Sequence, residues 1–264
     1  MAIPPLDFET PLLPPAGGGL VGAATLIDRP TPSRLAGGVH QWPTNCDVSA
    51  GVWPAIPCAD TTGLEKSGDR GTGDTFPATV VWGYDECDPG IPDETVMARA
   101  DHNRQLAEPA LLEAVFAERA LADAGTPTVA AGFVDAVSRL EAALADTGLV
   151  GVLHATPAAA AWAQHYGLII RNGQRLRTPL GHIWSFGPGY VLDTGVLFAT
   201  GPVTIHRDAP TTRVSVDADG KAAVSERTLV ASYECLATAV QITTGDGAQT
   251  LFPGGNPGQY PGVA

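Results

Sequence analysis

The sequence predicts an α+β protein in which helices pack against a mixed sheet. Three observations indicate this class. A long run of apolar residues at helical spacing extends from Asp93 to Asp123, short β-branched segments separated by Gly, Pro and Asp follow it, and a proline-rich segment precedes it. The chain has 264 residues, 44% of them hydrophobic, so it can bury one large core or two adjoining cores.

The composition and charge favour some classes of protein over others. Only 16% of the residues are charged, and 31 Gly and 23 Pro favour short strands and extended connections. The net charge of −13, with 15 Lys and Arg in no basic run, argues against tight binding of nucleic acid. No apolar stretch approaches the roughly 18 residues of a membrane helix, and no positive charge precedes Arg29 as a secretory signal would require. We expect a protein made in a cytosol.

Residues 1–60 are predicted to form an extended arm. Their prolines fix extended backbone and remove amide donors, so we expect neither a regular helix nor a central strand there. Residues 60–75 are polar and glycine-rich, which is typical of a loop, and Phe76–Tyr84 has the β-branched and aromatic residues of a strand. Deletion of residues 2–40 is therefore expected to leave a folded protein.

Three helices are predicted after this strand. The first starts with proline and acidic residues at 92–94, as the helix dipole favours, and Pro109 is expected to kink or divide it. The second covers about Val129 to Ala145 and is ended by Gly148. The third covers Ala158 to Tyr166 behind the cap Thr156-Pro157.

Short strands are predicted between Val150 and Ile242. We expect the last and longest, Arg227–Ile242, to be central and covered on both faces. The others are Val150–His154, Leu168–Ile170, Gly181–Phe186, Val196–Ala199, Val203–His206 and Arg213–Val216.

Over about residues 20–243, this order of elements resembles the fold of tailed-phage major capsid proteins, which encapsulin shell proteins share. The similarity is narrower to the capsid-type proteins of phages that infect actinobacteria. The segments that carry it are Gly151-Val-Leu-His-Ala155, Gly167-Leu-Ile-Ile-Arg-Asn-Gly173, Thr178-Pro-Leu-Gly181, Ala199-Thr-Gly201 and the strand Glu226-Arg-Thr-Leu-Val-Ala-Ser-Tyr-Glu-Cys235.

The resemblance implies four regions. They are an N-terminal arm (1–60), an extended loop and peripheral domain with a long spine helix (61–148), a compact axial domain of mixed sheet and helices (149–244) and an extended tail (245–264).

It also implies a structural protein that assembles with copies of itself, as pentamers and hexamers, into the icosahedral head of a tailed phage. Such a shell encloses DNA without reading its sequence, forms in the bacterial cytoplasm and becomes part of the virion. A separate scaffolding or decoration protein is a possible further partner. The alternatives are an encapsulin-like compartment shell, another virion protein of the decoration or tail type, and a Cys/His hydrolase.

Some features of related shells are not expected here. Certain capsid proteins of this fold crosslink a loop lysine to an asparagine with a glutamate as base. This chain has two lysines, Lys66 and Lys221, and although Glu65 lies beside Lys66, an exposed loop lysine is the ordinary interpretation. No encapsulin-type cargo groove, fused scaffold or cleaved leader is recognisable either.

The enzyme alternative depends on His154, at the end of an apolar strand, and on Cys235 with Asp193 or Glu234 as nucleophile, base and orienting group. Cys235, however, is predicted inside the last strand and not on the sharp turn that a nucleophile elbow needs. We therefore expect His154 to be structural, and no catalytic residue is assigned.

No metal or cofactor site is expected. The histidines occur singly, without metal-ligand spacing, at His40, His102, His154, His165, His182 and His206. The glycines at 68, 71 and 73 lack the strand and helix of a phosphate-binding loop. The favoured interpretation of Cys46, Cys58, Cys87 and Cys235 is buried, reduced thiols, and the alternative is a disulfide that involves Cys46 or Cys58.

Overall fold

The computed structural model of the chain describes residues 10–15, 17–30, 34–46, 49–52, 65–68, 71–173, 175–190, 192, 195–216 and 220–243. Its helices are α1 (Gly19–Ala23), α2 (Asp93–Ala124), α3 (Phe133–Asp146) and α4 (Pro157–His165), and a 3-10 turn, η1, covers Leu35–Gly37. The first strands are β1 (Thr25–Asp28), β2 (Val39–Gln41), β3 (Asp74–Phe76), β4 (Thr79–Cys87), β5 (Thr128–Ala130), β6 (Val152–Ala155) and β7 (Ile170–Asn172). The remaining strands are β8 (Arg175–Arg177), β9 (Ile183–Phe186), β10 (Val196–Thr200), β11 (Val203–Arg207), β12 (Thr211–Val216), β13 (Lys221–Tyr233) and β14 (Ala237–Ile242). Within these described ranges, no helix combines the length and the hydropathy needed to cross a membrane.

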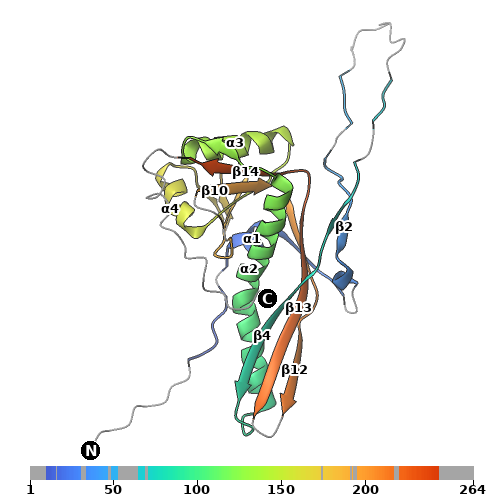
Figure 1. Cartoon of the computed structure of the whole chain (residues 1–264), viewed down its shortest axis with the longest axis vertical. Helices are drawn as coiled ribbons and strands as arrows, with labels where there is room; N and C mark the ends of the chain where they lie inside the picture. Colours follow the sequence, from blue (N-terminus) through green and yellow to red (C-terminus); the bar gives the residue numbers. More distant parts are fainter. Residues whose placement is uncertain are drawn as a thin grey trace, which may run out of the picture.

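A seven-stranded mixed sheet forms the compact part of the molecule, in the order β5-β14-β10-β6-β9-β8-β7. Its central strands β10, β6 and β9 are buried on both faces because α3 and α4 cover one face while α1 and α2 cover the other (Figure 1). Successive side chains of β10 point to opposite faces of the sheet. Leu197 packs in the α3 and α4 cluster, and Phe198 packs against Phe116 of α2.

The second, five-stranded sheet is built around β13. β4 pairs with one edge of β13, and β12 and β11 pair with successive parts of the other edge, with β1 parallel to β11. α2 packs along β4 and β13 (Figure 1). Gly83 of β4 allows a close approach, because a Cβ there would lie 2.3 Å from the backbone nitrogen of Arg104 and 2.4 Å from the carbonyl oxygen of Ala100.

α2 is fastened to β13 by a buried ionic network. The guanidinium of Arg104, whose residue is 2% exposed, donates to Ser225 Oγ at 3.1 Å, to Asp101 Oδ1 at 2.7 Å and to Glu108. Arg227 of β13 donates to the second oxygen of Glu108 at 3.1 Å. Two cations and two carboxylates therefore neutralise one another, which a buried group of charges requires.

α2 runs without interruption through Pro109, so the predicted division of this helix is wrong. Proline removes one backbone hydrogen bond from the helix, but tertiary contacts of the neighbouring residues stabilise the helix by more than this loss. Glu108 joins the ionic network, and the buried residues Leu112 and Glu113 follow in the next turn.

The predicted absence of a helix from the first sixty residues is also wrong, because α1 and β1 belong to the folded body. Leu20 is completely buried in the larger core cluster, and β1 extends the five-stranded sheet as its edge strand. The predicted second helix begins later than expected, since 128–130 forms β5 parallel to β14 and Gly132 caps α3.

The expected final strand is in fact two strands in different sheets. β13 ends at Tyr233, and the chain turns at Cys235, whose φ of 70° lies in the left-handed region, before β14 begins. The turn packs on Gly201, where a Cβ would lie 1.9 Å from the carbonyl oxygen of Glu234. The α+β class is confirmed, and both β13 and β14 have a neighbouring strand on each edge.

We predict that Arg104→Met destabilises the fold by about 3 to 5 kcal/mol, because it leaves the buried carboxylate of Glu108 with one cation fewer. Urea denaturation followed by circular dichroism measures this change. Arg139→Met is the matched control, since Arg139 forms an exposed helical ion pair with Asp135 at 3.0 Å. The free energy of unfolding of this variant should lie within about 0.5 kcal/mol of the wild-type value. Equal midpoints for both variants would contradict a stabilising role of the network.

Candidate subunit-contact surfaces

A long extension leaves the body between β2 and β3. β2 pairs with β3 in antiparallel register, Val39 opposite Phe76 and Gln41 opposite Asp74. Beyond this pair, residues 49–52 and 65–68 lie along an extension that points away from the body (Figure 1). The described residues 49–52 and 65–68 are exposed, so their surface is available to another molecule.

The base of this extension is fixed to the spine helix α2. The ring of Phe76, 2% exposed, meets the ring of Tyr233 edge to face, with centroids 5.2 Å apart. The guanidinium of Arg119 in α2 lies 5.0 Å from the Phe76 ring centroid, donates to Thr75 O at 3.1 Å and pairs with Asp74 at 2.8 Å. The strand pair thus has a rigid foundation although each of its strands is short.

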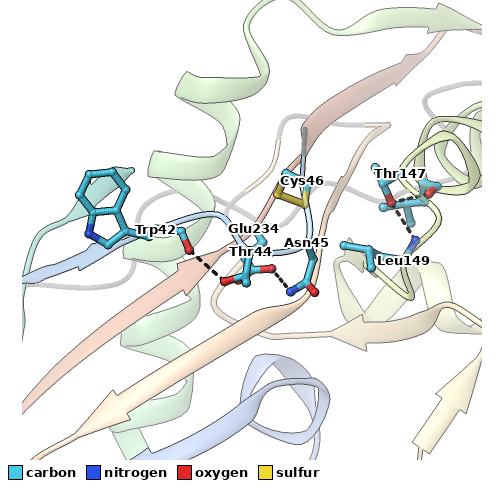
Figure 2. Close-up of a disulfide and its surroundings, with 9 residues drawn as sticks. Trp42, Thr44, Asn45, Cys46, Thr147, Leu149 and Glu234 are labelled. Atoms are coloured by element: carbon cyan, nitrogen blue, oxygen red, sulfur yellow. Dashed lines mark hydrogen bonds between the residues drawn. A yellow bond between two sulfur atoms is a disulfide. The ribbon is translucent and has the colours of Figure 1, made fainter. Parts of the chain in front are cut away.

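A disulfide between Cys46 and Cys235 joins the chain just after β2 to the turn between β13 and β14 (Figure 2). Their Cα atoms are 5.2 Å apart, and beside them Asn45 Nδ2 donates to Glu234 Oε2 at 2.6 Å. The favoured prediction of reduced thiols is therefore wrong for this pair, and the alternative that involved Cys46 is correct. Cys87 carries a free thiol, and Cys58 lies outside the described residues.

The N-terminal segment before α1 exposes apolar side chains. Leu12 is 51% and Leu13 67% exposed, and residues 10–15 lead away from the body (Figure 1). The anchor for this segment is the buried Glu113, which accepts hydrogen bonds from the backbone N–H of Leu20 and of Gly189, both at 2.9 Å. Burial raises the pKa of the Glu113 carboxyl.

The face of β4 that points away from α2 carries an exposed apolar row. Val81 and Gly83 face α2, so the alternating residues Val80, Trp82 and Tyr84, the outer β4 row, face outward. They are 54%, 59% and 43% exposed. Apolar side chains that gather on one exposed face are typical of a surface that meets another protein.

His154 is buried in a hydrogen-bonded network. Its Nδ1 lies 2.9 Å from the Tyr190 hydroxyl and its Nε2 lies 2.9 Å from Thr200 Oγ1. Thr200 donates to Gly201 O at 3.1 Å, so it accepts from an Nε2–H, and Nδ1 then accepts from Tyr190. Burial lowers the pKa of His154 to about 3, so the ring is neutral at physiological pH.

The residues of the enzyme alternative are not brought into one network. His154 is hydrogen bonded to Tyr190 and Thr200, whereas Cys235 is oxidised to Cys46 and Glu234 accepts from Asn45. Asp193 lies outside the described residues. Cys235 does occupy a sharp turn, contrary to the prediction, but its sulfur is part of a disulfide and is no thiolate nucleophile.

The six histidines have separate surroundings. His40 contacts Thr75 at 2.9 Å, His182 accepts from the N–H of Gly151 at 3.2 Å, and His206 accepts from Arg29 at 2.8 Å. In the described part of the chain, the group of potential metal ligands that comes together is Cys46, Glu234 and Cys235. Because these two sulfurs are bonded to each other, they are not thiolate ligands in this state.

The two lysines lie in different settings. Lys66 is exposed in the segment 65–68, whereas Lys221 is 8% exposed and donates to Ile91 O at 2.7 Å beside Asp93. Lys221 thus has a structural role, and the absence of a crosslink at Lys66 stays a prediction.

Several solved structures of phages and particle capsids share this architecture. The capsid of an empty GTA particle is 13% identical with a TM-score of 0.52, over 91% of this chain and 94% of that chain. A structure of Mycobacterium phage Adephagia is 14% identical with a TM-score of 0.51, over 90% of this chain and 95% of that chain. A structure of Microbacterium phage Oxtober96 is 12% identical with a TM-score of 0.51, over 91% of this chain and 96% of that chain. The chain therefore has the tailed-phage capsid-protein fold, and the resemblance expected from the sequence is confirmed for the fold. No family model matches the chain, and no curated protein matches it by sequence.

We predict a pH dependence of stability that comes from His154. Between pH 6.5 and about 3 the unfolded chain protonates this ring and the folded chain does not, so stability is lost as the pH falls. Within this pH range, protonation of His154 in the unfolded chain lowers the free energy of unfolding by about 1.4 kcal/mol for each pH unit. His154→Gln should flatten the slope of the urea unfolding free energy against pH by this amount.

Thr200→Val is the control for this experiment, because it removes a hydrogen-bonding partner of His154 and leaves the titrating ring in place. This variant should be less stable at every pH and keep the wild-type slope. Equal slopes for His154→Gln and the wild type would contradict the assignment.

Proposed function

We propose that this chain is the subunit of an icosahedral phage head, which assembles with copies of itself and encloses DNA. The observation that carries the proposal is the agreement of fold with the capsid of a GTA particle over 91% of this chain. The exposed surfaces support it, since an isolated subunit gains nothing from a projecting loop, exposed leucines at 12 and 13 and the outer β4 row.

In this proposal the work of the protein is mechanical. The arm and the loop extend over neighbouring subunits, so each copy buries surface on several partners, and many weak heterologous contacts close a shell of pentamers and hexamers. The division into arm (1–60), loop and peripheral domain (61–148), axial domain (149–244) and tail (245–264) belongs to the same proposal. The exposed segments 10–15 and 49–52 are the described parts of the arm that fit this role.

The charge of the chain fits a container for DNA better than a DNA-binding protein. A net charge of −13 disfavours phosphate contacts, so we infer that the shell holds the genome without sequence-specific binding. We further infer that the chain has no enzymatic activity and that it assembles in the bacterial cytoplasm as part of the virion. A separate scaffolding or decoration protein is a candidate further partner.

Negative-stain microscopy and sizing chromatography test this function on the full chain, expressed alone and with its neighbouring genes. Closed shells or rings of five and six subunits are expected. Shells that form around a co-expressed cargo protein and never package DNA would favour the encapsulin-like alternative. A stable monomer or dimer under every condition would contradict the proposal and return attention to an accessory virion protein.

We predict that removal of residues 2–15 abolishes closed shells and leaves the subunit folded. The earlier expectation for removal of residues 2–40 has to be revised, because that deletion also takes away the buried Leu20 and strand β1. The shorter deletion should keep the wild-type urea midpoint. Leu20→Ala in the full chain should lower the free energy of unfolding by about 2 to 5 kcal/mol. Normal shells from the shorter deletion would show that the arm has no role in assembly.

A further inference from the structure

The Cys46–Cys235 disulfide connects two segments that serve different parts of the molecule. The cysteines are 189 residues apart. Cys46 belongs to the loop stem, defined as β2, β3 and residues 42–46 (Figure 2). Cys235 lies in the turn between β13 and β14, where the chain passes from one sheet to the other. The bond therefore fixes the outgoing strand of the projecting loop to the junction of the two sheets.

The other contacts of residues 42–46 are noncovalent, and they include an edge-to-face contact between the rings of Trp42 and His40, whose centroids are 4.9 Å apart. β2 and β3 share three residue pairs. The hydrogen bonds from Asn45 to Glu234 at 2.6 Å and from Thr44 to the carbonyl oxygen of Trp42 at 3.4 Å are exposed to water. Exposed polar contacts contribute little to stability because water competes for the same groups. The covalent bond is thus the strongest constraint on this segment.

Small thiol reagents can reach the two sulfurs. Cys235 is exposed, Cys46 is half-buried, and both line a cavity of about 400 Å³ together with Pro43, Tyr233 and Leu236. Accessible disulfides respond to the redox state of their compartment, and a bacterial cytoplasm keeps such pairs reduced.

We propose that Cys46 and Cys235 form a redox latch, which is open as two thiols when the chain is made and closes when the chain meets an oxidising environment. In the open state residues 42–46 keep only noncovalent contacts and can move away from the turn at Cys235, while β3 stays fixed to α2 through Arg119. In the closed state residues 42–46 are fixed to this turn. A role of the latch in assembly, and its open state in a bacterial cytoplasm, rest on the proposed function, whereas the redox response of the single subunit does not.

Closure needs an oxidant, and a low-molecular-weight disulfide is sufficient. The thiolate of the more exposed Cys235 attacks this disulfide, forms a mixed disulfide and releases one small thiolate, which takes up a proton. The thiolate of Cys46 then attacks the Cys235 sulfur and releases the second small thiol. The two protein sulfurs lose two electrons in total, and the small disulfide gains them.

Hydrogen exchange with mass spectrometry tests the latch on the unassembled full chain, treated with oxidised glutathione or with dithiothreitol. Amides of residues 39–46 should exchange roughly tenfold faster or more after reduction, because their local opening no longer works against a covalent bond. Cys46→Ser should exchange like the reduced wild type in both reagents. Cys87→Ser is the matched control and should keep the full response, since Cys87 is a thiol already.

A second measurement establishes the state in cells. Acid quenching and alkylation before lysis should label both Cys46 and Cys235, and peptides from protein left in air or oxidised glutathione should contain the Cys46–Cys235 pair. Equal exchange in both redox states, a disulfide already formed in the cytoplasm, or pairing of either residue with Cys58 would each overturn the proposal. These readouts use single subunits, so a failure to form shells contradicts the proposed function and leaves the latch intact.

Discussion

The helix α2 has to pack against two sheets at once, and the rest of the fold is arranged around this requirement. Its first half lies on β4 and β13 through the Arg104 network and the close contact at Gly83. Its second half enters the core of the seven-stranded sheet through Leu112 and Phe116. A single rigid helix can pack on both sheets only if the two sheets have a fixed relative position. The buried ionic network helps to fix this position, because its hydrogen bonds require a defined orientation and apolar packing does not.

The polar groups of the interior fix the connections in a similar way. Glu113 binds the backbone of α1 and of the segment at Gly189 to the middle of α2. His154 joins β6 to β10 through Thr200, and it joins β6 to the loop between β9 and β10 through Tyr190. Each of these groups is buried with its hydrogen bonds satisfied, so a displaced segment would leave a polar atom without a partner, at a cost comparable to a core cavity.

A body held in this way can carry long segments that contribute little to its own stability. The arm before α1 and the extension beyond β2 and β3 each start from a buried anchor, Leu20 in the first case and Phe76 in the second. The described parts of both segments are largely exposed, and the arm exposes the apolar side chains of Leu12 and Leu13. Such an arrangement suits the contacts between subunits that we propose, because the body folds first and the extensions then bind neighbouring copies.

The sequence by itself determined the α+β class, the long helix from residue 93, the Thr156-Pro157 helix start and most of the short strands. Each of these depends on local spacing and on proline at the start of a helix. Tertiary structure decided the rest. It kept α2 continuous at Pro109, placed α1 in the core despite the surrounding prolines, and split the segment 227–242 between two sheets at Cys235. It also brought Cys46 to Cys235 and surrounded His154 with Tyr190 and Thr200. These contacts join residues far apart in the chain, and local periodicity carries no information about which distant partners will meet.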